Sequence, residues 1–122
     1  MPDNCFHTDQ ELFNAIAKGD EQAFSDFFYR YNRKVYFFIL HITGVAAIAE
    51  ELVQDVFLRI WLKKATLNEV DNPGNYLFVI AKNRSLDHLD KAAGERRLQQ
   101  QIALKAVASR PEAEEKMIYK ES

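Results

Sequence analysis

Residues 49–61 combine carboxylates with large aliphatic side chains along one expected helix. One face carries apolar residues at helical spacing, which predict a buried stripe: Ala49, Leu52, Val53, Val56 and Ile60. The opposite face, flanked by Phe57 and Trp61, mixes acids, an amide and leucines: Glu51, Gln54, Asp55, Leu58 and Leu62. A solvated face does not need leucines, and a buried face disfavours unpaired carboxylates. The pattern therefore predicts a docking surface for a basic, partly apolar partner.

A second interpretation of the same face requires no partner. Glu50 and Glu51 lie near the expected start of the helix, where the helix dipole favours negative charge. Leu58 and Leu62 could be covered by another helix of the same domain. The pattern alone leaves both interpretations open.

Basic residues gather in a different part of the chain. Residues 82–110 contain seven of them: Lys82, Arg84, Lys91, Arg96, Arg97, Lys105 and Arg110. Three acids accompany them, so this stretch has a net charge of +4, whereas the whole chain has -2. An acidic docking face and a basic stretch on one small domain predict two different partners.

No pattern typical of catalysis or of metal binding occurs in the sequence. His7, His41 and His88 are far apart, and none is spaced from Cys5 as a pair of metal ligands would be. The glycines separate helices and do not form a phosphate-binding loop, and no serine has a neighbouring base. The sequence therefore predicts a protein that is not an enzyme and holds no cofactor.

Length and composition fit one soluble globular domain. The chain has 122 residues, of which 48% are hydrophobic and 28% charged. Cys5 is the single cysteine, which excludes a disulfide framework and favours a reducing compartment. The polar N-terminus lacks the apolar run of a signal peptide, and no segment is apolar over the length of a membrane span. We therefore expect a cytoplasmic protein with no membrane insertion.

Helix start and stop signals divide the first half of the chain. Thr8 and Glu11 have the spacing of a capping box, and Gly19 can end the short helix that follows. Asp20 caps a longer helix, which Gly44 ends. That second helix carries a largely aromatic stripe expected in the core: Phe24, Phe27, Phe28, Tyr31, Val35, Phe38, Ile39 and Ile42.

The third helix is expected over residues 45–64, and a polar connector follows it over residues 65–75. This connector is longer than the roughly two to eight residues common in helical bundles, which makes it a candidate for recognition. Asn72 and Pro73 predict the start of a fourth helix that runs to residue 91 or 93, with Gly94 as a stop or a weak point.

The fourth helix is expected to be covered on two sides. Leu77, Ile80 and Ala81 mark one buried side, and a second apolar set lies nearly opposite: Phe78, Leu86 and Leu89. Beyond Gly94 the chain is polar, with Pro111 interrupting it. The sequence thus predicts an all-α fold, a small bundle of about four helices with a polar C-terminal linker.

Several motifs, in this order, resemble region 2 of bacterial extracytoplasmic-function sigma factors, in the sigma-70 family. They are residues 20–24 (DEQAF), the segment around Tyr31, residues 49–57 (AEELVQDVF) and residues 81–83 (AKN) with Asp87. The resemblance covers about residues 9–97. It implies a non-catalytic initiation subunit that binds core RNA polymerase, and that recognises and melts promoter DNA at the minus-ten element.

The resemblance assigns a partner to each of the two surfaces. The acidic–aliphatic face matches the part that binds the coiled coil of the polymerase β′ subunit: Glu51, Gln54, Asp55, Leu58 and Trp61. Glu51 and Asp55 would pair with basic partner side chains, while Leu58 and Trp61 would be desolvated anchors.

The connector and the start of the fourth helix resemble the element that captures a flipped minus-ten base. Asn72, Asn75 and Tyr76 are the candidates for base contact, through amide hydrogen bonds and aromatic stacking. Asn72 is equally well explained as a helix cap, and Tyr76 as a packed side chain. Basic residues of the fourth helix would bind phosphates: Lys82, Arg84, Lys91, Arg96 and Arg97.

The chain departs from the family at two positions and in length. Tyr76 stands where the family usually has tryptophan, and Asp90 stands where it usually has arginine. The family also carries a second helical domain, region 4, so the chain resembles a fragment. We expect an N-terminal stretch over residues 1–7, a region 2-like domain over 8–97 and a linker over 98–122. The resemblance also implies an anti-sigma factor as a partner.

Two other classes of function remain open. A helical interaction or adaptor module could use the acidic–aliphatic face without contacting DNA, and a stand-alone helical DNA-binding regulator could use the basic stretch. Salt-dependent binding to single-stranded promoter DNA distinguishes a sigma factor from the adaptor, and binding to core polymerase distinguishes it from the regulator.

Overall fold

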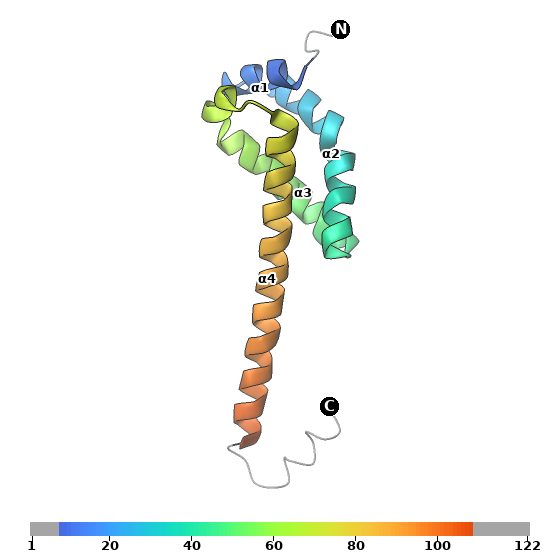
Figure 1. Cartoon of the computed structure of the whole chain (residues 1–122), viewed down its shortest axis with the longest axis vertical. Coiled ribbons are helices and arrows are strands. Elements are labelled where there is room, and N and C mark those ends of the chain that lie inside the picture. The colour runs from blue at the N-terminus through green and yellow to red at the C-terminus, as the bar shows by residue number, and fades with distance from the viewer. Residues whose placement is uncertain (1–7, 109–122) are drawn as a thin grey trace. The chain divides into compact units, whose positions relative to one another are not determined.

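The computed structural model describes residues 8–108, and the regular secondary structure within that range is entirely helical (Figure 1). They are α1 (Asp9–Ala17), α2 (Glu21–Thr43), α3 (Ala46–Leu62), the 3-10 helix η1 (Lys64–Glu69) and α4 (Pro73–Ala108). The chain divides into two compact units, one ending at Asp87 and the other beginning at His88. The predicted all-α fold is confirmed. No helix among the described residues is both long and apolar enough to cross a membrane.

Side-chain caps set the starts of the first two helices, as predicted. The Thr8 hydroxyl accepts a hydrogen bond from the Glu11 amide at 3.1 Å, and the Thr8 amide donates to the Glu11 carboxylate at 3.0 Å. Asp20 accepts from the Ala23 amide at 3.1 Å at the start of α2. Gly44 ends that helix in the left-handed conformation, with φ of 76°. This conformation costs glycine little free energy because glycine has no Cβ.

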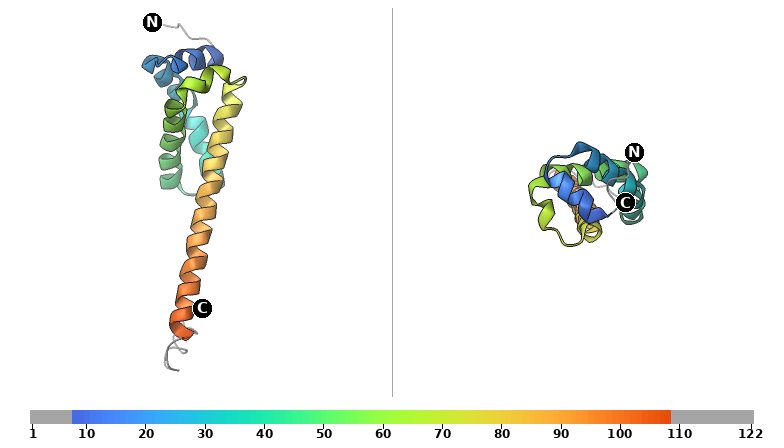
Figure 2. Two further views of the ribbon diagram at one scale, coloured as in Figure 1. Left: turned by 90° about the vertical axis from the view of Figure 1, so that its left-hand side faces the viewer. Right: turned by 90° about the horizontal axis from the view of Figure 1, so that it is seen from above.

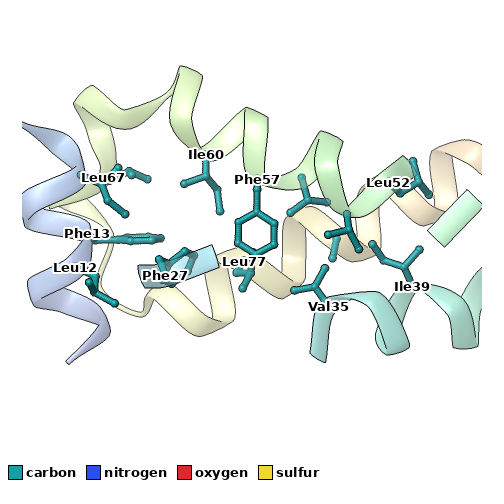
Figure 3. Packing of buried hydrophobic residues seen from close by; sticks show 14 of the residues in the cluster. Leu12, Phe13, Phe27, Val35, Ile39, Leu52, Phe57, Ile60, Leu67 and Leu77 are labelled. Atoms are coloured by element: carbon teal, nitrogen blue, oxygen red, sulfur yellow. The ribbon is translucent and has the colours of Figure 1, made fainter. Parts of the chain in front are cut away.

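The core of the first unit lies between α1, α2, α3, η1 and the first turns of α4 (Figure 3). Phe27 sits near its centre, with its ring 4.9 Å from the Phe13 ring and 6.0 Å from the Phe57 ring. All five residues of the predicted stripe of α3 are buried: Ala49, Leu52, Val53, Val56 and Ile60. Leu77 and Ala81 bring α4 into the same core.

The connector differs from its prediction, because residues 64–69 form η1 and only a short stretch before Pro73 is without helix. Leu67 is fully buried, and α1 and η1 lie side by side (Figure 2). Two hydrogen bonds close the turn, from the Val70 amide to the Leu67 carbonyl at 3.1 Å and from the Thr66 hydroxyl to the Lys63 carbonyl at 3.0 Å. One apolar side chain among the turn formers thus holds this segment against the core.

Two predictions about the fourth helix were wrong. Gly94 does not stop it, since α4 continues to Ala108. A glycine inside a helix costs about 1 kcal/mol relative to alanine, which favourable neighbours such as Ala92 and Ala93 can offset. The second apolar side is also mostly uncovered, because Leu86 and Leu89 remain 42% and 37% exposed. Phe78 alone is covered there, by Tyr31 and Phe38.

The second unit is described from His88 to Ala108, all of it within α4. Three of its large apolar side chains are more than half exposed: Leu98, Ile102 and Leu104. The expected domain end at residue 97 and the linker over 98–122 stay predictions. Residues 1–7 and 109–122 lie outside the described residues.

Candidate functional site

An apolar groove of about 480 Å³ runs between α2 and α3 in the first unit. It is lined by side chains from both helices: Glu21, Phe24, Phe28, Gln54, Phe57, Leu58 and Trp61. Helix α2 supplies one wall because its aromatic residues are denser than the core can absorb, so that Phe24 and Phe28 remain partly exposed. The groove therefore offers a preformed apolar surface to a partner.

Ring contacts hold the walls of this groove in place. The Phe24 and Trp61 rings are 5.1 Å apart, and the Phe28 and Phe57 rings 4.9 Å apart, so each pair joins α2 to α3. Leu58 is 53% exposed at the lip. Lys64 places its ammonium nitrogen 4.4 Å from the centre of the Trp61 ring, within the range of a cation–π contact.

A second depression extends the groove along the same two helices. The two share Phe28 and Gln54, and further side chains line the extension: Asn32, Arg33, Tyr36, Phe37, Glu50 and Val53. Phe37 is 54% exposed there. Arg33 and Glu50 place opposite charges along the extension, whereas Glu21 is the charged residue of the first depression. The combined lining is largely apolar and includes a few charged side chains, a composition that protein-docking surfaces share.

Three of the five predicted polymerase-binding residues line this groove: Gln54, Leu58 and Trp61. Glu51 is exposed on the same helix but outside the lining. Phe57 was expected to flank the exposed face, but it is only 2% exposed, because it fills the space between α2 and α3 as part of the core. The wall from α2 could not be recognised in the sequence, since Phe24 and Phe28 follow the spacing of core aromatics.

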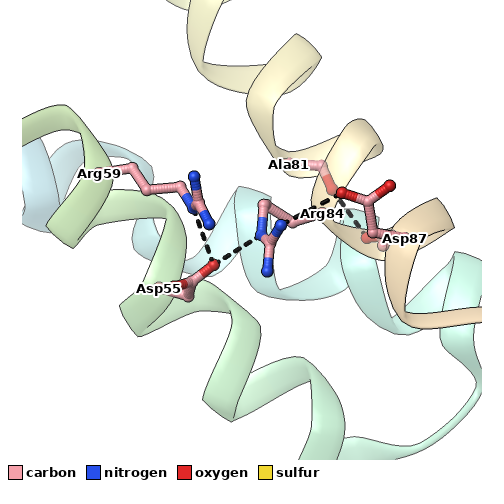
Figure 4. A network of polar contacts seen from close by, with 6 residues as sticks. Asp55, Arg59, Ala81, Arg84 and Asp87 are labelled. Carbon is pink, nitrogen blue, oxygen red and sulfur yellow. Dashed lines mark hydrogen bonds and ion pairs between the residues drawn. The ribbon is translucent and has the colours of Figure 1, made fainter. Parts of the chain in front are cut away.

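Asp55, the fifth of those residues, is engaged within the chain (Figure 4). One of its oxygens accepts hydrogen bonds from Arg84 Nε at 2.7 Å and from Arg59 Nε at 3.2 Å. Arg84 also donates to Asp87 at 3.2 Å. Burial alone would raise the pKa of the Asp55 carboxyl, but the hydrogen bonds from Arg84 and Arg59 lower it below its ordinary value.

At the start of α4, two of the three predicted base-reading residues have structural partners. The Asn72 side-chain oxygen accepts a hydrogen bond from the backbone N–H of Asn75 at 3.0 Å, so Asn72 caps the helix. Tyr76 sets its ring edge-on to the Phe13 ring at 6.1 Å and is partly buried. Asn75 is exposed. The capping role of Asn72 is confirmed, and Asn75 is the candidate whose side chain faces solvent.

The predicted phosphate-binding residues are divided between the two units. Lys82 and Arg84 belong to the first, where Lys82 is exposed and Arg84 is engaged by Asp55 and Asp87. The second unit carries the other three, all exposed: Lys91, Arg96 and Arg97.

The Tyr31 side chain packs against the first turn of α4. Its hydroxyl donates to Asp9 of α1, and Arg30 pairs with the same carboxylate at 2.8 Å. A Cβ added to Gly74 would lie 3.5 Å from that hydroxyl, so the phenol packs directly against the turn that presents Asn75. Burial, with the hydrogen bond to Asp9 acting in the same direction, raises the pKa of Tyr31 to about 12.

The fold and this surface define a small helical domain with an apolar groove between α2 and α3. Residues 27–95, more than half of the chain, match the Sigma-70 region 2 family, and the chain belongs to that family. The predicted resemblance is thereby confirmed.

A curated relative, the ECF RNA polymerase sigma factor SigK of Mycolicibacterium vanbaalenii, is 28% identical over 79 residues. That alignment covers 64% of this chain and 40% of the relative, so the chain spans less than half of the relative's length. No solved structure matches the chain.

Proposed function

We propose that this chain is the part of a transcription initiation subunit that binds core RNA polymerase through the α2–α3 groove and captures minus-ten DNA near the start of α4. The observation that carries the proposal is the groove itself, with Leu58 and Trp61 at its surface, in a chain of the Sigma-70 region 2 family. The role is one of binding, with no catalytic step of its own.

Polymerase binding would combine apolar burial with charge steering. Leu58 and Trp61 would become buried against the β′ coiled coil, which the family resemblance suggests as the partner. Glu21, Glu50 and Glu51 lie in or beside the groove and would attract a basic partner and set its orientation. An anti-sigma factor would compete for polymerase binding; its existence stays a prediction.

DNA capture would use the exposed Asn75 amide for a base edge and the exposed cations for phosphates. Four of the exposed cations on α4 are the predicted phosphate contacts Lys82, Lys91, Arg96 and Arg97. Such contacts to phosphates raise affinity and its salt dependence without reading sequence. Tyr76, whose ring contacts Phe13 and is partly buried, would offer a base only the exposed part of its ring.

A single substitution in the groove tests polymerase binding. Leu58→Ala should weaken binding to core polymerase about tenfold, as removal of a desolvated anchor typically does. Leu98→Ala is the matched control, because Leu98 is 56% exposed, against 53% for Leu58, and lies outside the groove. Titration of each variant with labelled core enzyme measures the effect. Equal affinities for the two variants would rule out the groove as the docking site.

A helical adaptor that contacts no DNA is the second candidate. The observation in its favour is that Asn72 and Arg84, two of the predicted DNA contacts, have partners inside the chain. The adaptor hypothesis predicts polymerase or protein binding with no salt-dependent affinity for single-stranded minus-ten DNA. A sigma factor in complex with core polymerase must show that affinity.

A further inference from the structure

Two residues predicted to serve different partners meet in one ion pair. Asp55 belongs to the helix of the docking face and Arg84 to the helix of the DNA contacts, and Arg84 Nε lies 2.7 Å from Asp55 Oδ2. Both residues belong to the first unit. In the described chain, each of the two surfaces thus contributes one member of this pair.

The surrounding charges cancel. Arg59, Asp55, Arg84 and Asp87 form a chain of two guanidinium groups and two carboxylates, joined at 3.2, 2.7 and 3.2 Å (Figure 4). The side chains of Asp55 and Arg84 are 34% and 29% exposed, so water screens this pair less than a fully exposed one. A phosphate that approaches Arg84 therefore meets a group with no net charge.

Arg59 makes an exchange of partners at Asp55 possible. If Arg84 leaves, Arg59 still donates to the same carboxylate oxygen, so Asp55 is not left as an unpaired charge. Arg84 in turn keeps Asp87, one turn away on its own helix, which holds its guanidinium near α4. Each side of the broken pair thus retains one charged partner.

We propose that Asp55 withholds Arg84 from DNA in the unbound chain, and that a basic side chain of the docked polymerase replaces Arg84 at Asp55 and releases it to a backbone phosphate. This inference rests on the proposed function and adds a coupling between its two surfaces. Asp55 acts as a positioning residue for Arg84 in the unbound chain and joins the docking face only when polymerase binds, whereas Glu51 and the groove residues belong to that face in both states.

Neutralising Asp55 should mimic the docked state. In the absence of polymerase, Asp55→Asn should bind single-stranded minus-ten DNA about fivefold more tightly than the wild type, as one added phosphate contact would give. The slope of log affinity against log salt should steepen by roughly 0.7. Arg84→Gln combined with Asp55→Asn should abolish both gains. Fluorescence anisotropy with a labelled oligonucleotide at several salt concentrations measures them.

Glu51→Gln is the matched control for charge. It removes the same unit of negative charge one turn away, from a residue for which no ion pair with Arg84 exists among residues 8–108. Its affinity for DNA should rise less than that of Asp55→Asn. Circular dichroism establishes whether each variant folds. If Asp55→Asn does not fold, Asp55→Ser provides a second neutral replacement.

The same titration with saturating core polymerase tests the exchange. The advantage of Asp55→Asn over the wild type should disappear, because docking has already released Arg84. Equal affinities without polymerase, a gain that survives Arg84→Gln, or an advantage undiminished by polymerase would each overturn the proposal. Failure to bind polymerase at all would instead refute the proposed function, and a direct binding titration detects it separately.

Discussion

Tyr31 shows how one side chain joins segments that are distant in the sequence. Its hydroxyl donates to Asp9 of α1 and also lies close to Gly74, and its ring contacts Phe27 and Phe78. The sequence predicted only that Tyr31 belongs to an aromatic stripe. The partner of the hydroxyl could not be predicted, because Asp9 precedes it by 22 residues in another helix.

The raised pKa of Tyr31 predicts a loss of stability at alkaline pH. The pKa rises from 10.0 to about 12 on folding, so the folded state retains the phenol proton more strongly than the unfolded state. The stabilising contribution is complete below pH 10.0 and is lost as the pH rises towards about 12. Urea unfolding over this range should show the decline in wild type and a smaller decline in Tyr31→Phe. Parallel pH profiles for the two proteins would contradict the assignment.

Asp55 marks the limit of prediction from helical spacing at the residue scale. Spacing placed it on the same face as Glu51 and Leu58, and the burial of the opposite stripe confirms the orientation of α3. Spacing could not reveal Arg84, 29 residues away, which occupies that carboxylate. A helical wheel predicts the direction of a side chain but not which distant charge it meets.

At the scale of elements, the caps and the buried stripes followed from local sequence, because each depends on residues within one or two turns. The bounds of α1 and α2 were predictable from Thr8, Asp20 and Gly44 for this reason. The segment η1 was not, since its fold depends on burial of Leu67 against α1. Gly94 was misjudged because the cost of one glycine is small compared with the preferences of a long helix.

The role of α1 as support for η1 can be tested at Leu67. Leu67→Ala removes a fully buried side chain between η1 and α1 and should lower the free energy of unfolding by about 3 kcal/mol. Leu62→Ala, five residues earlier and 70% exposed, is the control and should change it by less than about 0.5 kcal/mol. Chemical denaturation measures both. Similar losses in the two variants would show that Leu67 does not hold η1 in place.

At the scale of the whole molecule, charge is separated along the sequence. The chain carries a net charge of -2, yet residues 82–110 carry +4, so the rest of the chain is strongly acidic by comparison. Glu21, Glu50 and Glu51 contribute to that acidity in or beside the groove, and Arg96 and Arg97 contribute to the basic stretch. The two partners proposed above, one basic and one acidic, would therefore compete little for this small chain.

This separation predicts that the proposed binding to DNA can be weakened without weakening the proposed binding to polymerase. Replacing Arg96 and Arg97 together by alanine should leave the affinity for core polymerase unchanged, because neither residue lines the groove. For single-stranded minus-ten DNA, measured with polymerase bound, the salt slope should become shallower by roughly 0.7 for each phosphate that the variant no longer binds. Replacing the neutral neighbours Gln99 and Gln100 by alanine controls for changes in the helix itself. If both double variants kept the wild-type slope, the basic stretch of α4 would have no part in holding DNA.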